Sequence, residues 1–288
     1  MKPPAFSYFA PGTAREVVEL LAQYGGDARV LAGGQSLVPL MNLRMIRPAV
    51  LIDLNRCPEL DYIEQRGSYI AVGAMTRQIA ATRSPLLRKY CSLVSKALEL
   101  TGPVAVRSRS TVGGTIAHAD RVAELPAVAV ALDAVMVIES SRGKREVAAT
   151  DFFLGDLSTA VEADEFLREV RFPVCDERSH FSFTEVGVRQ EGVAVVGLAV
   201  HILSQGARVQ KTALVAMGVD SAPVRLKSAE SELMKRGLVT PFIEEIVRLA
   251  CEEIDPMPDP YTTAAYRKHA VGALMRKALQ AAAMESAK

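Results

Sequence analysis

The sequence lacks the features that mark a nucleic-acid-binding or membrane protein. Its 34 Lys and Arg are almost balanced by 33 Asp and Glu, and the resulting net charge of +1 argues against a nucleic-acid partner or a polybasic membrane anchor. The most apolar stretch, residues 125–132, ends at Asp133 and is far shorter than the ~20 residues of a spanning helix. We therefore expect no nucleic acid and no membrane span, and the N-terminus has no apolar signal core.

Closely spaced metal ligands and nucleophile motifs are also missing. No pair of cysteines has C-x-x-C spacing, no histidines have H-x-H or H-E-x-x-H spacing, and no Ser or Cys lies in a nucleophile-elbow context. We predict that the chain binds no metal of its own. Dispersed thiols are typical of a reducing compartment, so we expect a cytoplasmic protein. The cysteines and histidines concerned are Cys57, Cys91, Cys175, Cys251, His118, His180, His201 and His269.

Helices and strands alternate in the first part of the chain. The T-x-x-E capping box at Thr13 predicts a helix that ends at Gly25-Gly26, and Thr76 is expected to cap a short helix. Ser84-Pro85 predicts the start of a longer helix that runs through Leu100. Further helical and strand segments complete the pattern: strands 28–31, 50–52, 68–72, 135–139 and 166–172, a helical turn after Ser36, and a helix over 123–132.

After Pro173 the pattern changes to strands followed by helices. Strands are predicted over 181–188, 193–203 and 209–217, and helices over 227–235, 241–254 and 262–283. Successive strands without intervening helices indicate an antiparallel sheet, so the fold class is α+β. We predict a first domain over 1–174, with lobes of about 1–55 and 56–174, and a C-terminal domain over 175–288 with a three-stranded sheet and helices.

Two glycine segments are the most informative feature for function. Residues 30–36 read Val-Leu-Ala-Gly-Gly-Gln-Ser, and residues 110–115 read Ser-Thr-Val-Gly-Gly-Thr. Glycine lets a ligand approach the backbone, and backbone N–H groups in such turns form an anion cradle. Two facing turns would hold both phosphates of a dinucleotide without Lys or Arg. On pattern alone, a pair of ordinary tight turns explains the segments equally well.

A Rossmann interpretation fails despite Asp53, because no G-x-G-x-x-G precedes it. Asp120 and Glu124 are acceptors suited to ribose or ribityl hydroxyls beside a phosphate cradle. By spacing alone, a helix N-cap at Asp120 and a surface position for Glu124 in the first turn are somewhat favoured.

The chain resembles one family along essentially its whole length. The ordered motifs are Phe6-Ser7-Tyr8, the segment 28–39, Arg47-Pro48, Leu51-Ile52-Asp53-Leu54, the segment 107–114, Ala119-Asp120, Glu124-Leu125-Pro126, Tyr266-Arg267-Lys268-His269 and Arg276-Lys277-Ala278-Leu279. Together they are similar to the FAD-binding medium subunit of molybdenum hydroxylases, the xanthine dehydrogenase and carbon monoxide dehydrogenase family.

The resemblance implies a two-lobed FAD-binding domain of the vanillyl-alcohol-oxidase-like (PCMH) type, with the two glycine segments clasping the FAD pyrophosphate. It implies that Asp120 and Glu124 lie along the ribityl and ribose, and that Leu167 packs on the cofactor. The full set of expected cofactor-binding residues is Val30, Leu31, Ala32, Gly33, Gly34, Gln35, Ser36, Leu37, Thr111, Val112, Gly113, Gly114, Thr115, His118, Asp120, Glu124, Leu167 and Glu185. No residue of this chain is expected to be catalytic, since the redox chemistry belongs to the flavin.

The resemblance also implies partners and an electron route. A large molybdopterin-binding subunit and a small subunit with [2Fe-2S] clusters would pass electrons to FAD here and then to an external acceptor, in a dimer of heterotrimers. The alternative is a self-contained flavin-dependent oxidase or reductase of the same FAD fold, and a non-catalytic nucleotide-binding or assembly protein is a third interpretation. The chain departs from its relatives at Glu185, where many carry Lys, and a carboxylate there would disfavour a flavin anion.

Overall fold

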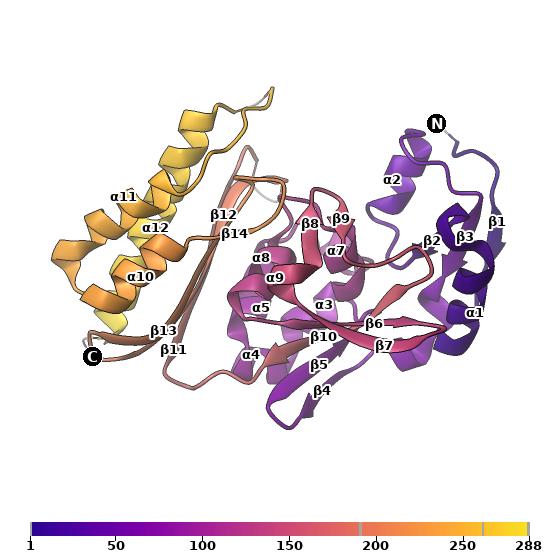
Figure 1. Cartoon of the computed structure of the whole chain (residues 1–288), viewed down its shortest axis with the longest axis horizontal. Coiled ribbons are helices and arrows are strands. Elements are labelled where there is room, and N and C mark those ends of the chain that lie inside the picture. Colours follow the sequence, from indigo (N-terminus) through magenta and orange to yellow (C-terminus); the bar gives the residue numbers. More distant parts are fainter. Residues whose placement is uncertain (1, 190–191, 261, 287–288) are drawn as a thin grey trace.

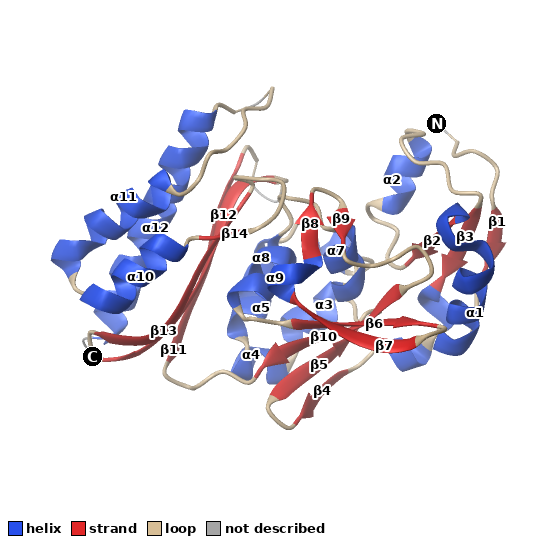
Figure 2. Cartoon of the chain, in the orientation of Figure 1, coloured by secondary structure: helices blue, strands red, loops and turns tan. Residues whose placement is uncertain are grey.

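The computed structural model describes residues 2–189, 192–260 and 262–286 and contains three main sheets along the length of an elongated molecule (Figure 1). The N-terminal lobe lies at one end, and the last three helices lie at the other (Figure 1). Helices and strands occur throughout, as an α+β fold requires (Figure 2). Among the described residues, no helix is both long and apolar enough to span a membrane.

The N-terminal lobe is a three-stranded parallel sheet in the order β1-β3-β2. Its elements are β1 Ser7–Phe9, α1 Ala14–Tyr24, β2 Ala28–Leu31, α2 Leu37–Asn42 and β3 Val50–Asp53, with short 3-10 turns at Gly25–Asp27, Leu54–Arg56 and Pro58–Leu60. The predicted cap is present, because the Thr13 hydroxyl oxygen accepts the Glu16 N–H at 3.3 Å. The parallel order places the carboxyl ends of β2 and β3 side by side, where Ala32 and Leu54 begin the connecting segments.

The second lobe is a five-stranded antiparallel sheet with helices packed against it (Figure 2). The strand order is β4-β5-β10-β6-β7, with β4 Ile63–Arg66, β5 Tyr69–Gly73, β10 Phe166–Pro173, β6 Val135–Ser140 and β7 Gly143–Ala148. The helices are α3 Gln78–Arg83, α4 Pro85–Tyr90, α5 Ser92–Leu100, α6 Val104–Arg107, α7 Val112–His118, α8 Glu124–Ala131 and α9 Ala149–Phe152, and a small hairpin joins β8 Phe153–Gly155 to β9 Ser158–Thr159.

Two helix predictions for this lobe are wrong in detail. The helix predicted to run through Leu100 breaks at Cys91 into α4 and α5, because the Tyr90 carbonyl accepts the Cys175 N–H at 3.1 Å and the Cys91 thiol donates to the Pro173 carbonyl. Thr76 does not cap α3. Its hydroxyl donates to the Tyr62 carbonyl at 2.9 Å, and the cap position is one residue later.

The C-terminal sheet has one strand more than predicted. Its order is β11-β12-β13-β14, and the added β14 spans only Val224–Arg225 beside the three long strands. The elements are β11 Ser179–Gly187, β12 Ala194–Gln205, β13 Arg208–Met217, α10 Lys227–Arg236, α11 Ile243–Glu252 and α12 Ala264–Ser286, with a 3-10 turn at Thr240–Phe242.

This sheet lies between two layers of helices (Figure 1). One face packs on α10, α11 and α12, and the other shares a hydrophobic core with α5 and α8 of the second lobe. Phe181 and Phe183 of β11 belong to that shared core. A single core therefore crosses residue 174, and the two-domain division at this residue stays a prediction from the sequence.

Candidate functional site

The fold brings the two glycine segments into contact. A Cβ added at Gly33 would lie 2.8 Å from the Cα of Ser110, and one added at Gly114 would lie 3.3 Å from the Cβ of Ala32. Side chains at these glycines would therefore push the segments apart. Residues about eighty positions apart in the chain meet at one end of the N-terminal sheet.

The first segment, residues 32–36, leaves its backbone donors free. The N–H groups of Gly33, Gly34, Gln35 and Ser36 donate to no other group in the described ranges. Gly34 has a φ of +74°, which a residue with a side chain rarely adopts. Ser36 occupies the predicted cap position of α2, but its side chain makes no capping bond. Gly33 is buried and Gly34 half-buried, and N–H groups at such positions normally find a partner. Together with the free N–H groups of the exposed Gln35 and Ser36, they indicate an anion site.

A cavity of about 390 Å³ opens beside this segment, between α2 and the ends of β2 and β3. Its single acidic side chain, Asp53, is already engaged: the Asp53 carboxylate accepts the Tyr8 hydroxyl at 2.5 Å and the Asn55 N–H at 2.9 Å. Asn55 also donates to the Ala32 carbonyl at 3.0 Å, which fixes the start of the segment. The cavity is lined by Leu31, Ala32, Gly33, Gly34, Gln35, Val38, Pro39, Asn42, Asp53, Asn55 and Arg109.

The second segment differs from the expected amide cradle. Residues 112–118 form α7, so Gly113 and Gly114 lie in the first turn of a helix rather than in a loop. Their N–H groups are already used: Gly113 donates to the Ala74 carbonyl at 3.0 Å and Gly114 to the Thr111 hydroxyl oxygen at 2.9 Å. The N–H groups of Val112 and Thr115 are likewise bonded, to the Thr76 and Thr111 carbonyls. This segment offers a ligand the side-chain-free surface of Gly114 and two threonine hydroxyls, but not its amides.

Gln78 is a contributor that sequence reasoning missed. Its buried side chain donates through Nε2 to the Thr115 hydroxyl oxygen at 2.8 Å. Because that oxygen already accepts one hydrogen bond, the Thr115 hydroxyl is left to donate its own hydrogen. The spacing between positions 78 and 115 contains no signal of this contact, which depends on α3 and α7 being adjacent.

The segment after α7 turns the chain toward the C-terminal sheet. His118 is the last residue of α7, and Ala119 has a φ of +51°. Asp120 does not cap α8, because the cap position is Ala123; the Asp120 carboxylate instead accepts the Val122 N–H at 3.0 Å. Glu124 is the first residue of α8 but is buried, with 7% of its surface exposed, so the surface interpretation favoured by spacing is wrong.

The remaining predicted residues lie in three places. Leu167 and Val112 are buried in the core of the second lobe, and Leu167 lies at an irregularity of β10. Glu185 is half-buried on β11, and its Oε2 atom has no hydrogen-bond partner among the described residues. Val30 and Leu31 end β2, and Leu37 begins α2.

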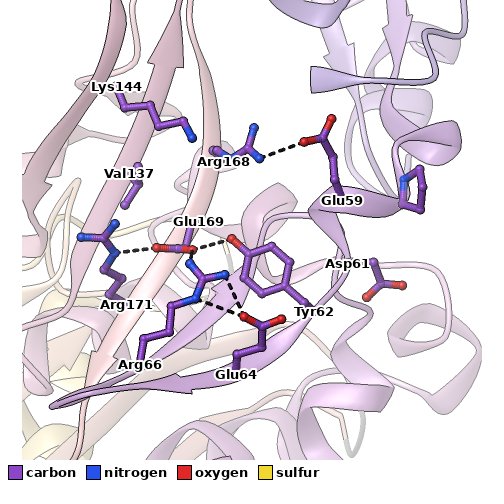
Figure 3. Close-up of a pocket in the computed structure, with 11 residues that line it drawn as sticks. Glu59, Asp61, Tyr62, Glu64, Arg66, Val137, Lys144, Arg168, Glu169 and Arg171 are labelled. Atoms are coloured by element: carbon purple, nitrogen blue, oxygen red, sulfur yellow. Dashed lines mark hydrogen bonds and ion pairs between the residues drawn. The ribbon is translucent and has the colours of Figure 1, made fainter. Parts of the chain in front are cut away.

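A second cavity, of about 540 Å³, lies beside the Pro58–Leu60 turn and is lined mostly by charged side chains (Figure 3). Those charges bind one another. The buried Glu169 carboxylate accepts from the Tyr62 hydroxyl, from Arg66 at 2.8 Å and from Arg171 at 2.5 Å (Figure 3). Burial pushes the pKa of Glu169 up, but hydrogen bonds from Tyr62 and Arg171 outweigh it and hold the pKa below its usual value. We therefore attribute a structural role to this cluster, which ties β4 to β10.

Comparison with known sequences decides the family. The pattern described as "FAD binding domain in molybdopterin dehydrogenase" matches residues 4–175, and that of the "CO dehydrogenase flavoprotein C-terminal domain" matches residues 181–282. The chain belongs to the FAD-binding medium-subunit family of the molybdenum hydroxylases. This membership confirms the resemblance inferred from the ordered motifs.

Individual members of the family are similar over their full length. The carbon monoxide dehydrogenase medium chain of Hydrogenophaga pseudoflava is 34% identical, with 98% of both chains covered. The 6-hydroxypseudooxynicotine dehydrogenase complex subunit alpha of Paenarthrobacter nicotinovorans is 33% identical over 97% of this chain and 95% of its own. A chain in the crystal structure of quinoline 2-oxidoreductase from Pseudomonas putida 86 is 34% identical, with complete coverage of both chains and a TM-score of 0.95.

The residues present fit the cofactor of this family. The free N–H groups of residues 33–36 belong to a segment that packs on Gly114 through Ala32, and the nearby Asp53 carboxylate is already bonded within the protein. Arg109 adds a cationic side chain to the lining of the cavity. Free amides, hydroxyls and a cation suit a diphosphate, which carries negative charge and only acceptor oxygens.

Proposed function

We propose that this medium subunit carries FAD between its two glycine segments and passes electrons from [2Fe-2S] clusters of a partner subunit to an external acceptor. The observation that carries the proposal is the run of four free N–H groups at residues 33–36, in a segment that packs on Gly114 through Ala32. The family match over nearly the whole chain supports the choice of FAD as the ligand. The flavin, when bound, would supply the redox chemistry, and the protein would bind and orient it.

The roles of the site residues follow from their positions. The amides of residues 33–36 and the hydroxyls of Ser36, Thr111 and Thr115 would donate to the diphosphate. Asp120 and Glu124, at the far end of α7, would accept from ribityl and ribose hydroxyls. Residues 112–118 span about 10 Å along the axis of α7. This length separates the diphosphate contacts at one end of the helix from the hydroxyl contacts at the other, by about the distance from a diphosphate to a ribityl chain.

The partners follow from the relatives, which are named as chains of multi-component dehydrogenases. We propose a large molybdopterin-binding subunit and a small [2Fe-2S] subunit, assembled as a dimer of heterotrimers. All four cysteines of this chain are free thiols, which supports a reducing, cytoplasmic location.

The direct test is FAD binding by the full-length chain. We expect the purified protein to bind one FAD and show bound-flavin absorbance. A Gly114→Val variant should lose it, because the new side chain would contact Ala32 and the Thr111 hydroxyl. Gly26→Val is the matched control, since nothing lies within 4 Å of a Cβ at that position. Normal flavin content in Gly114→Val, or a colourless wild type after incubation with FAD, would overturn the placement.

A second experiment tests the electron route. Affinity purification of the tagged chain, co-expressed with the genes beside its own, should recover a molybdopterin-binding chain and an iron–sulfur chain. In that complex the substrate of the large subunit should bleach the flavin absorbance. Oxidation of an organic donor by this chain alone would instead support a self-contained flavin oxidase.

A further inference from the structure

Two glutamates from distant parts of the chain converge where the C-terminal sheet packs on α8. Glu185 follows Phe181 and Phe183 at two-residue intervals on β11, with no register shift between them. Because alternate residues of a strand share a face, Glu185 points toward the same layer of helices as the two phenylalanines.

Glu124 lies in this layer of helices, because it is the first residue of α8. A hydrogen bond joins the segment before it to the C-terminal sheet: the Gly218 N–H donates to the Arg121 carbonyl at 2.9 Å. Gly218 directly follows β13, whose Met217 is paired with Gly197 on β12, and Gly197 is paired in turn with Glu185. The two glutamates therefore approach the same end of the sheet.

Among the described residues, neither the Glu124 nor the Glu185 carboxyl group forms an ion pair, and one oxygen atom of Glu185 has no hydrogen-bond partner. Glu185 Oε2 is buried without a hydrogen bond. Burial raises the pKa of Glu185 to about 7, with a further contribution from the negative charge of Glu124. Burial also raises the pKa of Glu124; the Thr101 hydroxyl and the positive charge of Arg107 oppose this rise, and Asp120 adds to it.

We propose that Glu124 and Glu185 form an electrostatically coupled carboxyl pair that holds one proton between its two members, the shared proton, and serves as a proton-accepting site beside the flavin. Two buried carboxyl groups that act on each other do not both ionise readily, so the first proton belongs to the pair rather than to either residue. The position of the flavin in this inference rests on the proposed function, whereas the shared proton is a property of this chain without FAD.

The pair has a consequence for reduction of the bound cofactor. With FAD bound, two electrons from an iron–sulfur donor and one proton from water would add one negative charge beside the pair. That charge would favour uptake of a second proton from water by the carboxylate that remains in the pair. Glu124 and Glu185 would thus couple the two electrons to two protons.

Infrared spectroscopy of the full-length protein without FAD tests the shared proton. The wild type should show the carbonyl band of a protonated, buried carboxyl group near neutral pH, and this band should vanish as the pH rises above about 7. Glu185→Gln and Glu124→Gln should each lose or shift it. Glu99→Gln, an exposed position on α5, is the control and should leave it unchanged. Absence of the band in the wild type at pH 6 would overturn the proposal whether or not FAD binds.

The pH dependence of the midpoint potential of the FAD-loaded protein tests the coupling. Between pH 6 and 7, where the pair of the oxidised protein still holds its first proton, the midpoint potential of the wild type should fall with the slope of two protons per two electrons. The Glu185→Gln variant should show the slope of one proton per two electrons. Equal slopes in the two proteins would refute the proton-accepting role. Failure to bind FAD would instead count against the proposed function, while the infrared result would still decide the shared proton.

Discussion

The two glycine segments have similar sequences but different structures. Residues 32–36 form an open turn in which four successive N–H groups are free, whereas residues 111–115 begin a capped helix in which the N–H groups of 112–115 are bonded. The first segment has spare hydrogen-bonding capacity and the second has almost none. The first is therefore suited to bind a ligand, and the second to hold the first in place through Gly114 and Ala32.

The largest effect on stability is expected for Gly113→Ala in the second segment. A Cβ at this position would lie 2.6 Å from the Cα of Ala74, and backbone cannot move aside as a flexible side chain does. Overpacking of this kind costs about 3 kcal/mol, which lowers the midpoint of thermal unfolding by roughly 5 °C in a chain of 288 residues. Gly26→Ala is the control in the same scan. An unchanged midpoint for Gly113→Ala would mean that α7 does not pack on β5 in this way.

A moderate effect is expected for Thr111→Val, which keeps the shape of the side chain but removes the hydroxyl. The Gly114 N–H then loses its capping partner, at a cost of about 1 kcal/mol in the free energy of unfolding. Urea denaturation of the two proteins measures this difference. A stability equal to that of the wild type would indicate that the hydroxyl is reserved for the ligand, as in the first segment.

The smallest effect on stability is expected for Ser36→Ala. The Ser36 hydroxyl makes no capping bond, so the free energy of unfolding without FAD should change by less than about 0.5 kcal/mol. The affinity for FAD should nevertheless fall by about tenfold, because a hydrogen bond to a charged phosphate would be lost. Fluorescence titration with FAD measures the affinity. A large loss of stability with normal FAD affinity would reverse the roles assigned to the two segments.

Much of the fold could be read from local patterns. The capping box predicted α1, and the strand runs before residue 174 and after residue 178 gave the α+β class. The break at Cys91 could not be predicted, because it depends on a hydrogen bond from Cys175, which is far away in the sequence. The same reason explains why Gln78 was missed and why spacing alone favoured a surface position for Glu124: both positions are set by helices that pack on them from elsewhere.

The sequence by itself determined the ingredients: glycines at positions 33, 34, 113 and 114, hydroxyls beside them, and the ordered motifs of the family. Only the tertiary structure decided which glycine segment keeps its N–H groups free and which one has them bonded. The reason is that a backbone N–H bonds to an acceptor that the packing of the chain places within reach. It also decided that the charge of Glu124 acts on Glu185. Electrostatic coupling depends on distance in space, and no spacing along the chain encodes that distance.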